Sequence, residues 1–360
     1  MISVDEATKA VLAEAYQWHI DNVPFDWAMN RVLAEDLYAD RDFPPFNRVA
    51  MDGISIQYQQ FVQGQRSFPI AGVAAAGAPQ LRLDVADQCM EVMTGCVLPG
   101  NTDTVIRYED LDIVDGVATI TIDEIQQGQN IHPRGLDKKE GDLVVPKGTK
   151  MSSAEIGVAA TVGRPTLKVL SPPATIIIST GDELVNVHER PLPHQIRRSN
   201  VYRIGSTLRS WGLDPVFQHL PDNRSLLLDQ LSNILAIYKL VILSGGVSKG
   251  KFDYLPGVLE ELGVKQLFHR VAQRPGKPFW FGQAPAGATI FALPGNPVSS
   301  FMCTHRYVNL WLEQCKGLDP LANRPHARLM EDFEFKPNLT YFLQVRLKYL
   351  PDGTTGAYPV

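Results

Sequence analysis

The sequence predicts a multidomain protein of α/β and β structure, with a doubly wound α/β domain at its centre. Between residues 172 and 318, continuous apolar strands alternate with helices, which is typical of a parallel sheet covered on both faces. Between residues 44 and 131, short strand-like runs are separated by Gly, Pro and Asn turns, which predicts an all-β block. The length of 360 residues suits two to four domains.

The N-terminal region, residues 3–38, is predicted to be helical, because apolar residues recur at helical spacing. Ser3 and Glu6 match a capping box at its start. After the β block, residues 132–170 have mixed character and contain a second helix with a capping-box pattern at Ser152 and Glu155.

The α/β region is expected to follow a regular order of elements. The predicted strands are "TIIIS", "DPVFQHL", "KLVILSGG", "KQLFHRVA", "PFWFGQA" and "ATIFAL"; the predicted helices are "SNVYRIGSTLRSWG", "NRSLLLDQLSNILAIY", "YLPGVLEELG" and the run after residue 298. The tail from about residue 319 alternates in the manner of β-strands. Its roughly 40 residues are few for an independent core, so we expect a short or incomplete β domain there.

Composition excludes several classes of protein. Hydrophobic residues make up 44% and charged residues 20% of the chain, as in ordinary globular proteins. The net charge of −5 argues against a nucleic-acid-binding surface, and no apolar run has the length of a membrane span. The N-terminus lacks the pattern of a signal peptide, and the four cysteines form no CxxC pair. We therefore expect a cytoplasmic protein with reduced cysteines.

Three strands of the α/β region end in polar or glycine-rich turns. Ligands of open α/β sheets bind at the carboxyl ends of strands, so these turns predict a site. The glycine-rich loop Gly245–Gly250 lets backbone amides approach a phosphate. Glu183 and Asp253 are placed to hold a divalent cation through carboxylate oxygens. Asp222 is either a further metal ligand or the cap of the following helix.

Two further turns have two interpretations each. Arg274 and Lys277 flank a Pro-Gly turn, where they either bind an oxyanion or form a solvated basic turn. The stretch "ALPGNPVSSF" either presents free N–H groups to an anion or is a tight turn capped by Ser299 or Ser300. The local pattern at Asp52 favours a hairpin turn over a functional role.

Taken together, the motifs resemble the molybdopterin molybdenumtransferase family, which is the bacterial MoeA type related to the gephyrin E domain. The resemblance spans about residues 3–335. The motifs that carry it, in family order, are "PPFNRVAMDG", "AGVAAAGAP", "TGCVLPGNTDTVIRYED", "NIHPRGLDKKEGDLVVPKGTKMSSAEIGVAATVG", "STGDEL", "SGGVSKGKFDY", "RPGKPFWFG" and "LPGNPVSS".

The resemblance implies four domains. Residues 1–43 and 132–171 would form an elongated domain I, and residues 44–131 an inserted β domain II. Residues 172–318 would form the α/β molybdopterin-binding domain III, and residues 319–360 a partial C-terminal β barrel. It also implies a homodimer, with a cleft between domain III of one subunit and domains I and II of the other.

The implied reaction inserts molybdenum from molybdate into adenylylated molybdopterin and releases AMP, with Mg²⁺ assisting. Matching family positions gives Asp52, Glu183, Asp222 and Asp253 catalytic roles, the last three as metal ligands. The implied substrate-binding residues are Thr94, Asp137, Gly245, Gly246, Ser248, Arg274, Lys277, Pro294, Pro297 and Ser299. Expected protein partners are the molybdopterin adenylyltransferase and acceptor molybdoenzymes.

The chain departs from the family pattern at Asn47, where Asp is usual, and at Arg274, where Lys is usual. Lys249 and Lys251 make the glycine-rich loop more basic than is common. Two alternative functions remain: a molybdopterin adenylyltransferase, and a gephyrin-like scaffold without turnover. Molybdate and tungstate share shape and charge, so the residues do not distinguish them.

Overall fold

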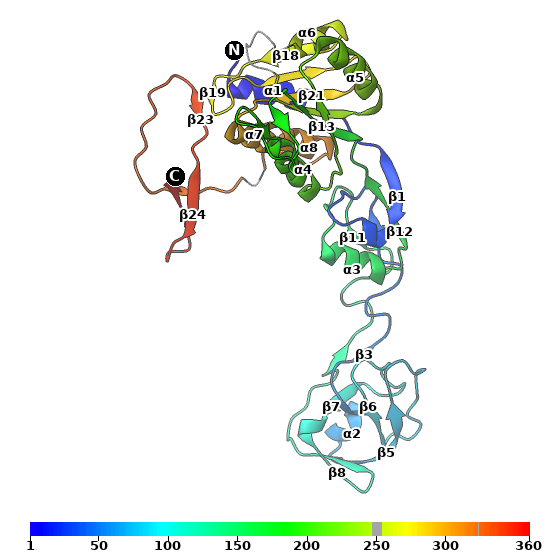
Figure 1. Ribbon diagram of the computed structural model, residues 1–360. Coiled ribbons are helices and arrows are strands. Elements are labelled where there is room, and N and C mark those ends of the chain that lie inside the picture. Colours follow the sequence, from blue (N-terminus) through cyan, green and yellow to red (C-terminus); the bar gives the residue numbers. More distant parts are fainter. Residues whose placement is uncertain (247–253, 323) are drawn as a thin grey trace. The chain divides into compact units, whose positions relative to one another are not determined.

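The computed structural model describes residues 1–246, 254–322 and 324–360 (Figure 1). The chain forms two compact units. The first unit comprises residues 1–34, 148–152 and 166–360, and the second comprises residues 35–147 and 153–165. Each unit has its own sheets and core. The subdivision into four domains stays a prediction.

The first unit is built on a six-stranded sheet with the order β16-β13-β17-β21-β20-β18. Its strands are β13 (Thr175–Thr180), β16 (Val216–Leu220), β17 (Leu240–Ser244), β18 (Lys265–His269), β20 (Trp280–Gln283) and β21 (Thr289–Leu293). Four neighbouring strands, from β16 to β21, are parallel, as predicted. β20 and β18 are antiparallel to their neighbours, which differs from the prediction. The turn between β20 and β21 is too short for the crossover that parallel strands need.

Helices cover both faces of this sheet, which confirms its doubly wound character. On one face, Ile176 and Ile178 of β13 pack with α5 (Arg224–Ile237) and α6 (Leu255–Glu261). On the other face, Ile177 packs with α4 (Ser199–Ser210) and the last helix. The last helix comprises α7 (Pro297–Cys303), a π-helical turn η3 (Thr304–Val308) and α8 (Asn309–Cys315). Alternate side chains along β13 therefore pack into two separate hydrophobic cores, one on each face of the sheet.

The N-terminal region is only partly helical. The capping box of Ser3 and Glu6 is present, but α1 (Val4–Ala13) ends far short of residue 38. The chain continues as β1 (Ile20–Pro24), paired antiparallel with β12 (Thr166–Leu170), and a 3₁₀ turn η1 (Phe25–Trp27). Pro24 lacks an N–H and disfavours helix at the preceding residue, so the prediction of one long helix was wrong.

The second unit contains the predicted all-β block. Its six-stranded sheet has the order β7-β4-β6-β5-β9-β8, formed by β4 (Gly53–Ile56), β5 (Ser67–Ala74), β6 (Cys89–Val92), β7 (Thr104–Arg107), β8 (Leu111–Val114) and β9 (Val117–Ile120). Short helices α2 (Tyr58–Val62) and η2 (Tyr108–Asp110) interrupt the strand-like runs. Elsewhere β2 (Leu37–Tyr38) pairs with β11 (Leu143–Val145), β3 (Arg48–Val49) pairs with β10 (Ile131–His132), and α3 (Ser153–Thr161) forms where the second helix was predicted.

The C-terminal segment is a small β structure of the first unit. β22 (Arg328–Leu329), β25 (Thr355–Pro359) and β24 (Val345–Tyr349) form a three-stranded sheet, while β23 (Thr340–Tyr341) pairs with β19 (Gln273–Arg274). Every residue of β24 is exposed. A partial barrel at this end of the chain stays a prediction.

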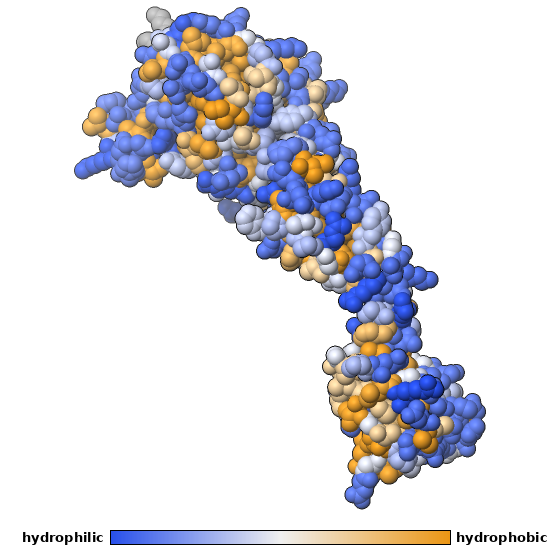
Figure 2. All heavy atoms as spheres, turned by 90° about the vertical axis from the view of Figure 1, so that its right-hand side faces the viewer, coloured by the Kyte–Doolittle hydropathy of each residue, from blue (hydrophilic) through white to orange (hydrophobic). Residues whose placement is uncertain are grey.

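Polar and apolar residues are interspersed on the molecular face that Figure 2 shows. Among the residues that the structure describes, no helix is both long and apolar enough to cross a membrane.

The aromatic core of the first unit provides a test of the fold. Phe291 is fully buried and its ring contacts Phe279, Phe281 and Trp311. We expect Phe291→Ala to lower the free energy of unfolding by about 3–5 kcal/mol, because it leaves a cavity. Urea unfolding followed by tryptophan fluorescence measures this change in the first unit, which contains all five tryptophans.

The control is Ile237→Ala, because Ile237 is 64% exposed and its truncation should cost little. A loss below about 1 kcal/mol in Phe291→Ala would contradict this packing.

Candidate functional site

A pocket of about 100 Å³ lies at the carboxyl ends of the parallel strands, where the sequence predicted a site. Thr180 comes from the end of β13, and Ser244 and Gly245 come from the end of β17. Gly295 and Pro297 come from the turn after β21. Glu183, Gly245 and Pro297, which the sequence predicted as site residues, are thus brought together.

The turn after β17 requires glycine at two positions. Gly245 has a φ of +102° and Gly246 a φ of +69°. A Cβ atom on Gly246 would lie 2.8 Å from Thr180 Oγ1, so no larger residue fits against Thr180. The Gly245 N–H donates to the Leu293 carbonyl at 3.1 Å and is not free for a phosphate. Ser248 and Asp253 lie outside the described residues.

Glu183 is exposed at the pocket edge, and its position depends on Gly181. A Cβ atom at Gly181, which has a φ of +131°, would lie 2.5 Å from Glu183 Oε2. The Glu183 carbonyl accepts a hydrogen bond from the Ile196 N–H at 2.9 Å. This bond belongs to the ladder of β14 (Leu184–Val185) and β15 (Ile196–Arg197), which forms one wall of the pocket.

Asp222 does not cap the helix that follows it. Asn223 is the cap of α5 and accepts from the Leu226 N–H at 3.1 Å. The Asp222 N–H donates to Asp182 Oδ1 at 3.1 Å, which joins the turns after β13 and β16. Within the described ranges no group of three or more His, Cys, Asp or Glu residues could hold a metal ion. Since Asp253 lies outside those ranges, the three-carboxylate metal site stays a prediction.

Asn296 caps the helix in the "LPGNPVSS" turn, so the assignment of Ser299 or Ser300 as the cap was wrong. The Asn296 side chain accepts from the N–H groups of Val298 at 2.9 Å and Ser299 at 3.2 Å. Asn is a strong helix cap, and Pro at the next position completes a favoured start. Two amides that an anion could have used are therefore already bonded.

Pro294 and Ser299 are both buried, whereas Pro297 is exposed and lines the pocket.

Helix α4 holds this turn against the sheet. The Asn200 amide nitrogen donates to the Gly295 carbonyl at 2.7 Å and to Ser244 Oγ at 3.3 Å. The Arg203 guanidinium donates to the Pro297 carbonyl and, at 2.8 Å, to Ser300 Oγ. The geometry of the pocket therefore depends on residues of α4 that the sequence analysis did not select.

Six consecutive pocket residues, Ile196 to Val201, were missed by the sequence analysis. Arg197 Nε donates to the Glu189 carbonyl at 3.1 Å, and the Arg198 guanidinium donates to Asn186 Oδ1. The available signal was the string "RRSN", in which two arginines precede a helix start.

Arg274 and Lys277 lie in the connection between β18 and β20. Because β18 runs in the same direction as β21, this connection leaves the sheet at the edge where the pocket lies. Both side chains are exposed, and neither lines the pocket. Their contact with an oxyanion stays a prediction.

In the second unit, Asp52 and Thr94 are in direct contact. Asp52 Oδ1 accepts from the Thr94 N–H at 2.5 Å. This bond, followed by one from the Thr94 side chain, lowers the pKa of the Asp52 carboxyl below its ordinary value. Asp52 is therefore a carboxylate at neutral pH. It precedes Gly53, where a Cβ atom would lie 1.9 Å from the Ile106 carbonyl oxygen.

Asp137 belongs to a chain of polar contacts in the same unit. His132 Nε2 lies 3.3 Å from Asp137 Oδ1, and His132 Nδ1 lies 3.2 Å from an Arg48 guanidinium nitrogen. Arginine can only donate, so His132 Nδ1 accepts and its Nε2–H donates to Asp137. Asn47, where the family has Asp, accepts from the Arg134 N–H at 2.9 Å. An amide oxygen thus serves as the acceptor at this position.

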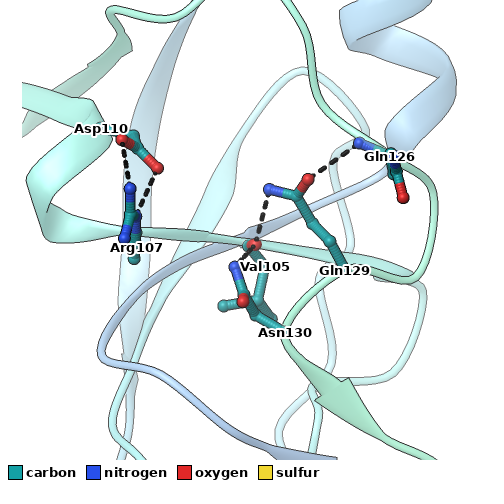
Figure 3. A network of polar contacts seen from close by, with 6 residues as sticks. All are labelled: Val105, Arg107, Asp110, Gln126, Gln129 and Asn130. Atoms are coloured by element: carbon teal, nitrogen blue, oxygen red, sulfur yellow. Dashed lines mark hydrogen bonds and ion pairs between the residues drawn. The ribbon is translucent and has the colours of Figure 1, made fainter.

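Figure 3 shows a network of polar contacts around the Val105 carbonyl. The Val105 carbonyl accepts from the side-chain amides of Asn130 at 2.9 Å and Gln129 at 3.4 Å. Gln129 Oε1 in turn accepts from the Gln126 N–H. The Asn130 carbonyl accepts from the Ala50 N–H, two residues before Asp52. The network therefore fixes the segment before His132 beside the segment that carries Asp52.

Comparison with protein families finds two matches. Residues 2–163 match the family described as "MoeA N-terminal region (domain I and II)". Residues 176–314 match the family described as "Probable molybdopterin binding domain". The second match contains the whole pocket.

Similar proteins cover the full chain. A molybdopterin molybdenumtransferase of Synechocystis sp. is 40% identical, and the alignment covers 100% of this chain and 90% of that protein. One of Staphylococcus epidermidis is 31% identical over 98% of this chain and 85% of that protein. Among solved structures, the molybdopterin biosynthesis MoeA protein of Pyrococcus horikoshii has a TM-score of 0.81 and 27% identity, covering 100% of this chain and 90% of that chain.

The Asp52–Thr94 contact predicts a titration result. We expect the pKa of Asp52 to lie below the ordinary value of an aspartate carboxyl, and Thr94→Val to raise it only part of the way back, because the backbone N–H remains. Because folding lowers this pKa, the stabilisation is present above the unfolded value of about 3.9 and is lost as pH falls through the folded value. Carboxyl-detected NMR measures the pKa of Asp52 in the wild type and in Thr94→Val.

The control is Thr121→Val, an exposed threonine of the same unit, which should leave the pKa of Asp52 unchanged. An Asp52 pKa at or above the ordinary aspartate value in the wild type would show that the contact does not form in solution.

Proposed function

This chain belongs to the molybdopterin molybdenumtransferase (MoeA) family, and we propose that it inserts molybdenum from molybdate into adenylylated molybdopterin with release of AMP. It is a transferase of molybdenum cofactor biosynthesis. The observation that carries the detailed proposal is the pocket at the carboxyl ends of β13, β17 and β21. It lies in the part that matches the molybdopterin-binding family.

The pocket suits the phosphate part of such a substrate. Gly245 lines the pocket without a side chain, and Arg197 and Arg198 supply positive charge in the lining. Charge-assisted hydrogen bonds from arginine are among the strongest contacts to phosphate oxygens. The substrate would bind here through its phosphoanhydride.

Glu183 and Asp222, with Asp253 from outside the described residues, would hold Mg²⁺. Carboxylate oxygens are the ligands that this ion prefers, and the Glu183 carboxylate is exposed at the pocket edge. The bound ion would neutralise charge on the phosphoanhydride during its cleavage. Asp182 is engaged by the Asp222 N–H, so Glu183 is the acid of this turn that remains to face the substrate.

Molybdate is a tetrahedral dianion, and Arg274, Lys277 and Ser299 would bind it at the same edge of the sheet. Tungstate would fit the same contacts. Asp52, Thr94 and Asp137 would contribute from the second unit of a partner subunit in a homodimer. The match to the MoeA N-terminal region favours this proposal over a lone adenylyltransferase domain.

Glu183 provides the experiment. We expect Glu183→Gln to lower molybdate-dependent AMP release by about a hundredfold, because it removes charge from the site where phosphate charge is neutralised. AMP is quantified by chromatography after the protein is mixed with adenylylated molybdopterin, Mg²⁺ and molybdate. Glu331→Gln, which changes an exposed acid of the C-terminal segment, should release AMP at the wild-type rate.

The outcomes separate the alternatives. AMP release that is equal with and without molybdate would contradict insertion. Consumption of ATP with molybdopterin would indicate an adenylyltransferase, and a folded dimer without any turnover would favour a scaffold.

A further inference from the structure

A buried network of polar side chains adjoins the turn that carries Arg274 and Lys277. Its members are Gln273 and Tyr307, both fully buried, and the thiol of Cys303. Tyr307 and Cys303 belong to the apolar core of the first unit. A buried amide is costly in such surroundings unless its groups are paired, so a paired one indicates that the fold needs a defined geometry there.

The hydrogen-bonding pattern of Gln273 is fixed by its neighbours. Its Nε2 donates to the Gly276 carbonyl at 2.9 Å and lies 3.6 Å from Cys303 Sγ. A carbonyl can only accept, so the amide cannot be flipped and Oε1 is the acceptor. The Tyr307 hydroxyl donates to Oε1 at 2.5 Å. Burial raises the pKa of the Tyr307 phenol, which therefore keeps the proton that it donates.

The turn packs closely onto the helix that carries Tyr307. Gly276 has a φ of +91°, and a Cβ atom there would lie 2.8 Å from Cys303 Sγ and 3.0 Å from Gln273 Nε2. Tyr307 belongs to the π-helical turn η3, and such turns are frequent at functional sites. The same helix begins at Pro297, which lines the pocket. One helix therefore contacts both turns that are proposed to bind the substrates.

Strand β19 places a buried amide next to a charged side chain. Gln273 and Arg274 are adjacent in this strand, so they point to opposite sides of it, one buried and one exposed. The Arg274 carbonyl accepts from the Phe342 N–H at 2.8 Å. The Lys277 carbonyl accepts from the Val271 N–H at 3.0 Å. The backbone that carries the two cations is thus bonded at each end, and the Gln273 amide holds its middle.

We propose that Gln273 and Tyr307 are positioning residues for the oxyanion substrate, although both are buried. The Tyr307 hydroxyl keeps the Gln273 amide in place, and the amide holds the Gly276 carbonyl. The turn thereby presents Arg274 and Lys277 in one arrangement before the oxyanion binds. The inference deepens the proposed function, on which it rests for the identity of the oxyanion as molybdate.

Tyr307→Phe is the decisive variant. It removes only the hydroxyl and leaves Gln273 Oε1 buried without a donor, so the amide gains free energy by turning toward water, which opens the turn. Molybdate then binds only the fraction of molecules that keep the turn closed, and its affinity should fall about tenfold. Equilibrium dialysis with elemental analysis measures the molybdate bound to the intact protein.

Hydrogen exchange reports on the turn without any ligand. The N–H groups of Val271 and Phe342 are bonded to carbonyls of the turn, so both should exchange about tenfold faster in Tyr307→Phe. Unchanged protection of both groups would contradict the role proposed for the hydroxyl.

Tyr16→Phe is the matched control. The Tyr16 hydroxyl is also buried in the first unit, and it has no hydrogen-bond partner among the described residues. Its ring packs edge-on against Trp311 of the same last helix, with 5.7 Å between ring centroids. Removing this hydroxyl should change neither molybdate affinity nor exchange. An equal loss of affinity in both tyrosine variants would overturn the proposal, because it would indicate a general loosening of the core.

A double variant, Gln273→Met with Tyr307→Phe, separates positioning from stability. It contains no buried amide at this place, so its unfolding temperature should be no lower than that of Tyr307→Phe alone. Its molybdate affinity should nevertheless stay low, because the Gly276 carbonyl has lost the Gln273 donor. Recovery of the affinity together with the stability would show that the pair is only structural.

Arg274→Ala tests the proposed function separately. Weak molybdate binding in Arg274→Ala, with wild-type affinity in Tyr307→Phe, would overturn the inference and leave the proposed oxyanion site standing. Wild-type affinity in both variants, or no binding by the wild type at millimolar molybdate, would contradict both. Weak binding in both variants, in a protein that releases no AMP from adenylylated molybdopterin, would support the inference and contradict the proposed reaction.

Discussion

The parallel pairing of β17 with β13 on one side and β21 on the other is the constraint on which the candidate site depends. Because the three strands run in register, their carboxyl ends lie at one edge of the sheet. The hydrogen bond from Gly245 N–H to the Leu293 carbonyl extends this register one step beyond β17. Turns that are far apart in the chain thereby share one pocket. A shift of β17 by one residue would move its side chains, including Ser244, to the opposite face of the sheet.

The turns themselves are held by backbone geometry and by α4. Gly181, Gly245 and Gly246 adopt positive φ values, and neighbouring atoms occupy the space that a side chain would need. Asn200 and Arg203 then bind the carbonyls of the turn after β21. Most hydrogen-bonding groups of the turns are satisfied within the protein. The geometry of the turns is therefore set before any ligand binds, which is what a preorganised binding site requires.

The sequence predicts the strands and helices of the sheet well, because continuous apolar runs such as "TIIIS" are buried on both faces. Strand direction at β18 and β20 depends on connection length and is not visible in hydrophobic pattern. The prediction of helix over residues 3–38 was wrong beyond residue 13. The chain there pairs with β12 as a strand, and this pairing is not visible in the spacing of apolar residues. Asn296 was overlooked as a cap in favour of nearby serines. Arg198 and Asn200 were missed because their contacts with Asn186 and Gly295 form only in the folded chain. The pairing of Asp52 with Thr94 joins residues 42 positions apart, and only the family resemblance selected both.

The account rests on the claim that this pocket, and no other edge of the sheet, binds the phosphate part of the substrate. A crystal structure of the protein with AMP tests the claim most directly. The account predicts phosphate density in the pocket, beside Gly245 and the Arg198 guanidinium. Phosphate density at Arg274 and Lys277, with an empty pocket between Thr180 and Pro297, would contradict it.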